Sequence, residues 1–217
     1  MGPVSVLVVD DEALVRSGVS MILNAADGVR VVATCGGPDA IGMFLRHRPD
    51  VVLLDIRMPV VDGLTVLRQL REQRDPPAVA MLTTFSADAQ VAAALRDGAA
   101  GFLLKDSEPD DLVAAVRALA AGGSVLSPSV TGTVIAGFVS SHASAEISAK
   151  VTTLSDREQD ILALVGQGLS NVAIAERLYL SLPTVKEHVS AILLKLGAEN
   201  RVQAAVMAHQ AGMIARP

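Results

Sequence analysis

Acidic residues follow two short apolar runs of the chain, Val4–Val9 and Val51–Leu54. The first run leads into the pair Asp10 and Asp11, and the second leads into Asp55. Two later apolar runs end in side chains of other kinds, which are Thr83 and Lys105. Three carboxylates, one hydroxyl and one ammonium therefore stand at the ends of four separate runs.

This set of side chains suits phosphoryl chemistry. Clustered carboxylates repel one another unless a cation is present, and ligands that are all oxygen favour Mg²⁺. A lysine beside them can bind phosphoryl oxygens as a point charge. A carboxylate next to the metal can attack phosphorus and form an acyl phosphate. A single Asp after a strand is more often a helix cap or a solvated loop residue, but the combination of five favours a shared site.

The elements that must position these side chains alternate between two types along residues 1–120. We expect five strands and five helices, which together predict an α/β domain with a doubly wound, five-stranded parallel sheet. In such a sheet, binding sites form at the carboxyl ends of the strands. The expected strands are Val4–Val9, Val31–Thr34, Val51–Leu54, Ala78–Thr83 and Gly101–Leu104, and the expected helices are Leu14–Ala25, Pro38–Arg48, Leu64–Arg74, Ala87–Asp97 and Asp110–Ala121.

The rest of the chain has no strand pattern. Residues 122–151 read as a linker, with a possible short helix at Ser127–Val139 and a solvated stretch at Ser140–Lys150. Dense helical patterns then predict a small all-α domain of four helices. Two of them, separated by a tight turn, form a helix-turn-helix at about Ser170 to Val189. A bundle that serves only dimerisation would have a similar composition. The predicted helices are Asp156–Gly166, Asn171–Leu178, Leu182–Leu196 and Asn200–Ala211.

Composition excludes several classes of protein. Hydrophobic residues make up 51% of the 217 residues, which excludes a wholly disordered chain. No apolar run approaches the ~20 residues that a membrane-spanning helix needs. A single Cys excludes a disulfide scaffold, and no basic segment precedes the first apolar run, so we expect a cytoplasmic protein.

The charge distribution limits how the chain can bind nucleic acid. Residues 1–120 have 11 basic and 16 acidic side chains, whereas residues 151–217 have six of each. Neither half has the basic excess of a general nucleic-acid binder. We therefore expect any DNA binding to depend on a local cluster of side chains and on more than one copy of the chain.

The first half resembles the flavodoxin-like receiver domain of two-component response regulators over residues 4–121. The resemblance is carried by four segments: Val8–Asp11, Asp55–Pro59 with Asp62 and Gly63, Leu82–Thr84, and Gly98–Lys105. It implies that Asp55 is the phosphoacceptor and that a sensor histidine kinase is the partner. It also implies that Asp11, Asp55 and the Arg57 backbone carbonyl bind Mg²⁺ and that Asp10 assists through water. Three further residues would bind the phosphoryl group or switch with it: Lys105, Thr83 and Phe102.

Residues 152–215 resemble the LuxR-type DNA-binding domain. The resemblance is carried by Leu154–Glu158, Gly168–Asn171 and Thr184–Lys186. Together the two resemblances indicate the NarL/FixJ group of transcription regulators, which dimerise when phosphorylated and bind double-stranded promoter DNA. A recognition helix at about 182–196 is implied, and the last helix is expected to form a dimer contact on DNA. The implied DNA-binding residues are Thr184, Val185, Lys186, His188, Val189, Ser190 and Lys195.

Two other functions are consistent with parts of the pattern. A regulator with a vestigial receiver would bind DNA without phosphorylation, but every position of the acidic site is filled. A metal-dependent phosphohydrolase would share the chemistry of Asp and Mg²⁺. It would need a second acidic base near Asp55 and would leave residues 152–215 without a role, so we expect a regulator and not an enzyme.

Overall fold

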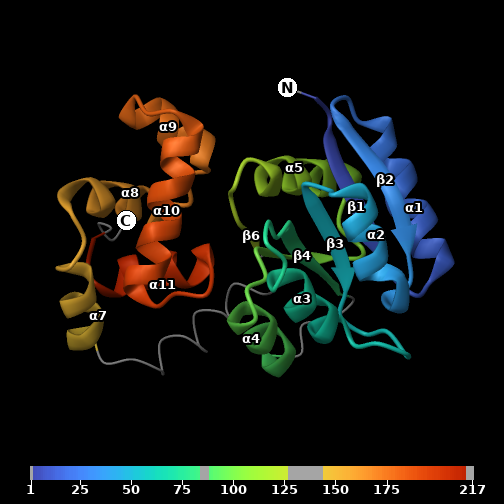
Figure 1. Ribbon diagram of the computed structural model, residues 1–217. Coiled ribbons are helices and arrows are strands. Elements are labelled where there is room, and N and C mark those ends of the chain that lie inside the picture. Colours follow the sequence, from blue (N-terminus) through green and yellow to red (C-terminus); the bar gives the residue numbers. More distant parts are fainter. Residues whose placement is uncertain (1, 84–87, 127–143, 214–217) are drawn as a thin grey trace.

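A computed structural model describes residues 2–83, 88–126 and 144–213 of the chain. The short helix predicted at Ser127–Val139 lies outside these residues. An α/β domain occupies the first part of the chain, and a helical domain occupies the last part (Figure 1).

The α/β domain is built on a parallel sheet with the strand order β2-β1-β3-β4-β5-β6. All five predicted strands are present, and a short sixth strand pairs with β5. The central strand β3 is buried along its whole length, which explains its continuous apolar run. The strands are β1 (Val4–Val9), β2 (Val29–Cys35), β3 (Val51–Asp55), β4 (Ala78–Thr83), β5 (Gly101–Leu104) and β6 (Val125–Leu126).

Helices cover both faces of the sheet, as the doubly wound prediction requires (Figure 1). Leu7 and Val9 of β1 point into a core built with α2, α3 and α4. Val6 and Val8 point to the opposite face and pack with α1 and α5. The helices of this domain are α1 (Ala13–Ala25), the short 3₁₀ helix η1 (Gly37–Asp39), α2 (Ala40–His47), α3 (Gly63–Arg71), α4 (Asp88–Arg96) and α5 (Pro109–Ala120).

Strand register and one glycine position the loops at the carboxyl edge of the sheet. Asp55 lies opposite Leu82, and Thr83 lies opposite Leu104, so the ends of β3, β4 and β5 are adjacent. Gly63 begins α3 directly against the end of β3. A Cβ atom on Gly63 would lie 2.1 Å from the Asp55 carbonyl oxygen, so a side chain cannot be accommodated there.

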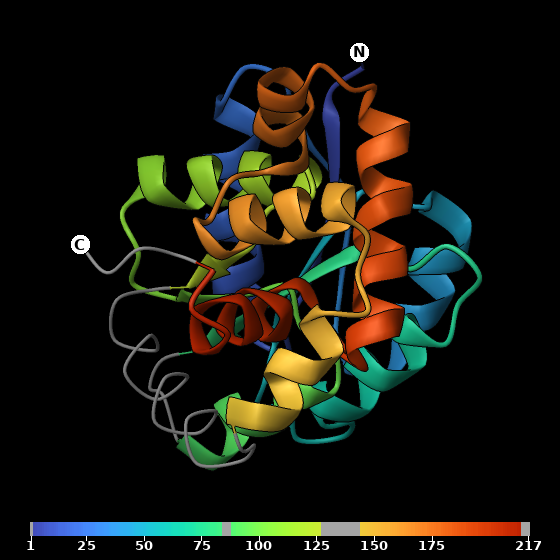
Figure 2. The ribbon, with the colours of Figure 1, turned by 90° about the vertical axis from the view of Figure 1, so that its left-hand side faces the viewer.

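The C-terminal domain contains α7 (Ser144–Val151), α8 (Asp156–Gly166), α9 (Asn171–Leu178), α10 (Leu182–Leu196) and α11 (Arg201–Gln210) (Figure 2). Side chains cap the starts of the last four helices. Ser155 and Glu158 form a capping box on α8, Ser170 caps α9, Ser181 caps α10 and Asn200 caps α11. These polar caps explain why the helix boundaries agree closely with the sequence pattern.

Residues 144–150 were expected to be a solvated stretch of linker, and this expectation was wrong. They belong to α7, whose Ile147 and Val151 are buried in the core of the helical domain. Tertiary packing stabilises this helix of eight residues, because an isolated helix this short is only marginally stable in water.

No helix among the described residues is both long enough and apolar enough to cross a membrane.

The two domains are in contact in this structure. Asn200, at the start of α11, donates a hydrogen bond from Nδ2 to the backbone carbonyl of Leu95 in α4. Gln203 Nε2 donates to the same carbonyl at 3.4 Å, and Val202 joins the core on the α2–α4 face of the sheet. On another part of the interface, a Cβ atom on Gly122 would lie 2.2 Å from Nδ2 of Asn171. The start of α11 therefore packs against the α/β domain.

Candidate functional site

Two of the three acidic residues predicted at the strand ends, Asp10 and Asp55, meet around one lysine. Lys105 Nζ lies 2.7 Å from Oδ2 of Asp10 and 3.1 Å from Oδ2 of Asp55. Oε1 of Glu12, which was not predicted as a site residue, lies 3.5 Å from the same nitrogen. Asp10 and Asp55 are buried, so their charges are balanced mainly by the Lys105 ammonium.

The pKa values of Asp55 and Lys105 are both raised, but for different reasons. Burial raises the pKa of the Asp55 carboxyl, and the hydrogen bond and positive charge of Lys105 only partly oppose that effect. Burial acts to lower the pKa of the Lys105 ammonium, but hydrogen bonds and charges from Asp10 and Asp55 outweigh it, so this pKa is raised. The lysine is therefore fully protonated at neutral pH and faces Asp55 as a cation.

Asp11 is turned away from this cluster. Its Oδ1 accepts a hydrogen bond from the Gly37 backbone N–H at 3.2 Å. A Cβ atom on Gly36 would lie 2.8 Å from the same oxygen, so the turn after β2 closes around the carboxylate. Because this contact is made by a backbone N–H from a distant loop, no sequence signal predicts it.

The oxygen ligands that Mg²⁺ prefers are present at this edge of the sheet. They are the carboxylates of Asp10, Asp11 and Asp55, together with the predicted backbone carbonyl of Arg57. The backbone N–H of the same Arg57 hydrogen-bonds to Asp55. Within the described residues, no group of acidic, His or Cys side chains is already arranged as a metal site. The donor set therefore fits Mg²⁺ chemically, whereas in this structure Lys105 holds Asp10 and Asp55 together and Asp11 faces Gly37.

Thr83 and Phe102 lie where the sequence predicted, on β4 and β5. Thr83 is buried at the end of its strand, and its carbonyl oxygen accepts a hydrogen bond from the Lys105 backbone N–H at 2.9 Å. Phe102 is fully buried in the core beneath the site. Strands β4 and β5 thus carry the threonine and the aromatic residue, and the lysine follows the end of β5 directly.

The recognition helix predicted at about 182–196 is α10. Lys186, Glu187 and Ser190 are exposed on it, whereas Thr184, His188 and Val189 are half-buried. Val185 is fully buried in the core of the helical domain. The expectation that Val185 contacts DNA was therefore wrong, because its side chain holds the helix against the domain.

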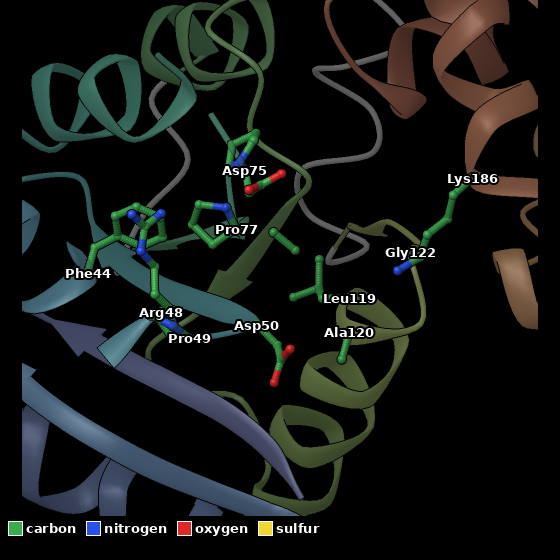
Figure 3. Close-up of a pocket in the computed structure, with 12 residues that line it drawn as sticks. Phe44, Arg48, Pro49, Asp50, Asp75, Pro77, Leu119, Ala120, Gly122 and Lys186 are labelled. Atoms are coloured by element: carbon green, nitrogen blue, oxygen red, sulfur yellow. The ribbon is translucent and has the colours of Figure 1, made fainter. Parts of the chain in front are cut away.

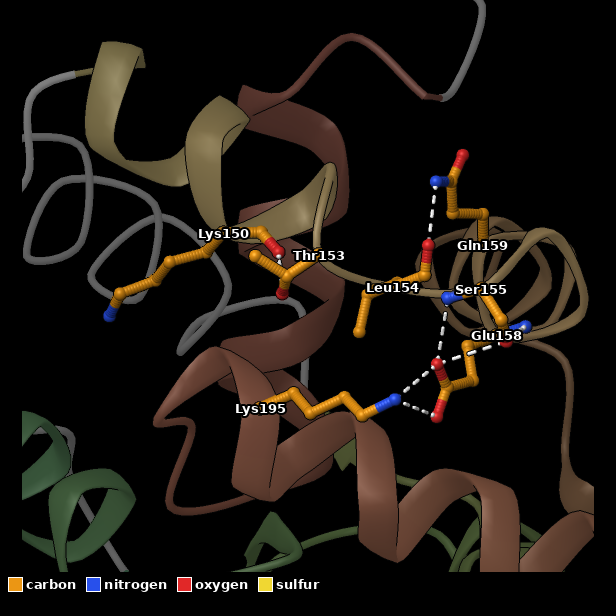
Figure 4. A network of polar contacts seen from close by, with 7 residues as sticks. All are labelled: Lys150, Thr153, Leu154, Ser155, Glu158, Gln159 and Lys195. Atoms are coloured by element: carbon orange, nitrogen blue, oxygen red, sulfur yellow. Dashed lines mark hydrogen bonds and ion pairs between the residues drawn. The ribbon is translucent and has the colours of Figure 1, made fainter.

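Lys195, the other predicted DNA-contacting cation on α10, is engaged within its own domain. Its Nζ lies 2.7 and 2.8 Å from the two carboxylate oxygens of Glu158 (Figure 4). Glu158 also accepts a hydrogen bond from the Ser155 backbone N–H at 2.8 Å, as part of the cap of α8. The hydrogen bond from Lys195, aided by Ser155, lowers the pKa of Glu158 to about 2. Lys195 therefore joins α10 to the start of α8.

Lys186 faces the α/β domain. It lines a cavity of about 370 Å³ together with Arg48, Asp50 and Asp75 from the edge of the sheet opposite the acidic site. Figure 3 shows its side chain extending from α10 toward Gly122. The exposed cation of the predicted recognition helix is thus turned to the neighbouring domain, which adds two carboxylates to its surroundings.

Comparison with protein families assigns both domains. The model of the response regulator receiver domain matches residues 6–117, and that of the bacterial regulatory proteins of the luxR family matches residues 152–208. The fold and the acidic site thus define a receiver joined to a helix-turn-helix domain. The chain belongs to the NarL/FixJ group of two-component response regulators, which are DNA-binding transcription regulators.

Individual relatives match almost the whole chain. The nitrate/nitrite response regulator protein NarL of Escherichia coli is 38% identical over 209 residues, which are 96% of each chain. The transcriptional regulatory protein LnrK of Bacillus subtilis is 36% identical over 216 residues, with 97% of this chain and 98% of LnrK covered. The crystal structure of ChrA, a response regulator of a heme-sensing two-component system, has a TM-score of 0.54 at 36% identity. This structural match covers 99% of this chain and 100% of ChrA.

Proposed function

We propose that this response regulator is phosphorylated on Asp55 by a sensor histidine kinase in the cytoplasm, and that the phosphorylated form dimerises and binds promoter DNA. The observation that carries the proposal is the position of Asp55. Its buried carboxylate lies at the carboxyl edge of the sheet, 3.1 Å from the Lys105 ammonium. A phosphoryl group on Asp55 would take up the positive charge that Lys105 now shares between two carboxylates.

The chemistry follows from the side chains at this edge. An Asp55 oxygen attacks phosphorus, the bond from phosphorus to the donor breaks, and an acyl phosphate forms on Asp55. Lys105 pairs with the phosphoryl oxygens. Asp10, Asp11, Asp55 and the Arg57 carbonyl would hold Mg²⁺, which supplies positive charge for the attacked phosphoryl group. In this structure Oδ1 of Asp11 accepts a hydrogen bond from the Gly37 N–H, so Asp11 would contribute through its other carboxylate oxygen or after this bond is released.

Thr83 and Phe102 would carry the change of state to the rest of the receiver. Thr83 stands at the end of β4, beside the strand that leads to Lys105. A hydrogen bond from its hydroxyl to the phosphoryl group would draw the end of β4 toward Asp55. Phe102, which is buried next to this strand pair, would then change its rotamer.

DNA binding would require release of the helical domain. Lys186 faces the receiver cavity, and the start of α11 packs against α4 through Asn200. In this arrangement α10 cannot present Lys186 to a DNA groove, and the first turn of α11 is not available for the expected dimer contact. Phosphorylation would therefore act by favouring the separated domains and their dimer.

The alternative, a vestigial receiver that leaves DNA binding independent of phosphorylation, has no specific support, because the acidic site is complete. A phosphohydrolase is also disfavoured, because residues 152–208 match a family of DNA-binding regulators. Acetyl phosphate with Mg²⁺ separates these functions. A regulator retains one phosphoryl group per chain, whereas a hydrolase releases phosphate continuously.

The decisive experiment is intact-mass spectrometry of the full chain after incubation with acetyl phosphate and Mg²⁺. We expect one added phosphoryl group in the wild type and none in Asp55→Asn. Asp106→Asn is a matched control, because this exposed carboxylate follows Lys105 directly but lies outside the predicted site. A phosphorylated Asp55→Asn protein would show that the acceptor is another residue.

Removal of the metal is a separate test of the acidic site. Excess chelator should stop phosphorylation of the wild type, because Asp10, Asp11 and Asp55 would repel an incoming phosphoryl donor without a divalent cation. Added Mg²⁺ should restore it. Phosphorylation at an undiminished rate in chelator would contradict the proposed Mg²⁺ site.

A further inference from the structure

A small cavity lies where the segment after α5 meets the helical domain. Its volume is about 190 Å³. Ser124, which precedes β6, lines it from the receiver side. The end of α8 and the first residues of α11 line it from the other side, with Gly166, Gly168, Arg201 and Val202. It is distinct from the acidic site and from the cavity that Lys186 lines.

Arg201 brings an uncompensated positive charge to this cavity. The residue is only 9% exposed. Its Nη1 donates to Oδ1 of Asn171 at 2.7 Å, and its Nη2 donates to the backbone carbonyl of Leu169. Both partners are neutral, and no described carboxylate pairs with the guanidinium. Burial lowers the pKa of Arg201 to about 10, so the group stays charged at neutral pH without a counterion.

Ser124 brings an unused hydroxyl to the same cavity. Its Oγ is buried and has no hydrogen-bond partner within the described structure. Most buried polar atoms are hydrogen-bonded, and an unsatisfied one costs free energy. The hydroxyl can donate one hydrogen bond to an acceptor in the cavity.

We propose that this cavity binds a small oxyanion, a phosphate or a carboxylate, between Arg201 and Ser124. A buried charge is stable when it is paired and hydrogen-bonded. An oxyanion would supply the missing negative charge to the guanidinium and would accept the hydrogen bond of the hydroxyl. A bound water could satisfy Ser124 but would leave the charge of Arg201 unbalanced. An apolar ligand would satisfy neither group.

The ligand would bridge the two domains, since Ser124 belongs to the receiver side and Arg201 to the helical domain. It would therefore stabilise the arrangement in which Lys186 faces the receiver. By thermodynamic reciprocity, the oxyanion and promoter DNA would weaken each other's binding. The mutual weakening of oxyanion and DNA binding rests on the function proposed above, whereas oxyanion binding by the unphosphorylated chain does not. An experiment can therefore show that the oxyanion site is absent without bearing on the proposed function, and the reverse.

Isothermal titration calorimetry of the full unphosphorylated chain tests the site directly. The protein is first freed of metal with chelator, and the chelator is then removed because its own carboxylates could compete. The titrants are inorganic phosphate and acetate in separate runs, with sodium chloride as the control for ionic strength. We expect saturable binding of one oxyanion per chain. The run that saturates at the lower concentration tells whether phosphate or carboxylate is preferred.

Three substitutions locate the binding. Arg201→Gln should abolish saturable binding. Ser124→Ala should raise the Kd about tenfold, the change expected for loss of one hydrogen bond to a charged group. Arg157→Gln is the matched control, because Arg157 also donates to a backbone carbonyl, that of Leu178 at 2.9 Å, but lies outside the cavity. It should bind as the wild type does. If Arg201→Gln does not fold, as judged by circular dichroism, Ser124→Ala carries the test.

Several results would overturn the proposal. One is a wild type that does not saturate below about 10 mM of either oxyanion, since binding that weak has little free energy to link the domains. Another is equal binding by the wild type and Arg201→Gln, which would mean an adventitious ion only. An unchanged Kd in Ser124→Ala would show that the ligand does not bridge the domains.

Discussion

Lys105 supplies the positive charge that balances the buried carboxylates of the acidic site. It balances two buried carboxylates, and yet burial still raises the pKa of Asp55. A carboxyl whose pKa is higher in the folded state than in the unfolded state favours folding in its protonated form. The native protein therefore loses stability as the pH rises through the folded pKa of Asp55.

Asp55→Asn removes a buried charge but keeps the shape of the side chain, so it should be more stable than the wild type at pH 7. The advantage should shrink as the pH falls toward 3.8, the ordinary pKa of Asp, because the wild-type carboxyl then becomes neutral. Urea unfolding at several pH values measures the difference. An advantage that grows toward acid would contradict it.

For Glu158 we predict the opposite pH dependence of stability. Its pKa is lowered from 4.5 to about 2, chiefly by the hydrogen bond from Lys195 and then by that from Ser155. The ionised carboxylate therefore stabilises the helical domain above pH 4.5, and this contribution disappears as the pH falls from 4.5 toward 2. Relative to Glu158→Gln, the wild type should be more stable at pH 7 and should lose that advantage in this window. Glu176→Gln, at an exposed carboxylate of α9, should show no such change.

The sequence predicts residue types at the site better than it predicts their orientation. Asp10, Asp55, Thr83 and Lys105 lie at strand ends, where parallel topology brings them to one edge. The direction of the Asp11 side chain depends on the Gly37 N–H, a long-range contact that no local pattern reveals.

The spacing of apolar residues along α10 predicts that Val185 is buried. It lies seven residues before Ile192 and eleven before Leu196, which is the spacing of a buried helix stripe. The structure places all three in the core of the helical domain. Lys186, Glu187 and Ser190 lie outside this stripe and are exposed.

At the scale of elements, the junction between β3 and α3 leaves no room for a side chain at Gly63. Gly63→Ala would place a Cβ atom 2.1 Å from the Asp55 carbonyl oxygen. We expect a loss of about 1–3 kcal/mol in the free energy of unfolding, as for other overpacked sites. The control is Gly42→Ala within α2, where a Cβ meets nothing within 4 Å and should add about 0.5–1 kcal/mol. Equal effects in thermal unfolding would contradict the close approach at Gly63.

Capped helices were the elements easiest to predict. The predicted ranges of α8, α9 and α10 agree with the structure, because Ser155, Ser170 and Ser181 mark their starts. The sequence did not reveal α7 or β6. Packing of Ile147 and Val151 stabilises α7, and β6 has only two residues whose pairing partner is β5. Both elements are stabilised by tertiary contacts and not by their own sequence pattern.

At the scale of the whole molecule, charge limits DNA affinity. Residues 151–217 have six basic and six acidic side chains, and Lys195 is already paired with Glu158. One copy can therefore neutralise few phosphates, whereas two joined copies make the second contact nearly intramolecular. Coupling of only ~1–3 kcal/mol between phosphorylation and dimerisation is enough to change promoter occupancy.

We therefore predict that the phosphorylated chain binds a repeated DNA site at least several-fold more tightly than the unphosphorylated chain. Lys186→Ala should remove most of this binding, because Lys186 is the exposed cation of α10 that no described carboxylate pairs with. Gel-shift titration at fixed salt measures both effects. Equal affinity of the two forms, at concentrations where the unphosphorylated chain is monomeric, would contradict dimerisation as the switch. Strong residual binding by Lys186→Ala would contradict the role given to α10.

The short strand β6 determines where the receiver can be cut from the rest of the chain. Val125 and Leu126 pair with Gly101 and Phe102, and they cover the outer edge of β5. A fragment that stops at residue 121 would leave that edge with open backbone donors and acceptors, which is a template for intermolecular strand pairing. A receiver fragment made for crystallisation or spectroscopy should therefore extend through residue 126, or it will tend to aggregate.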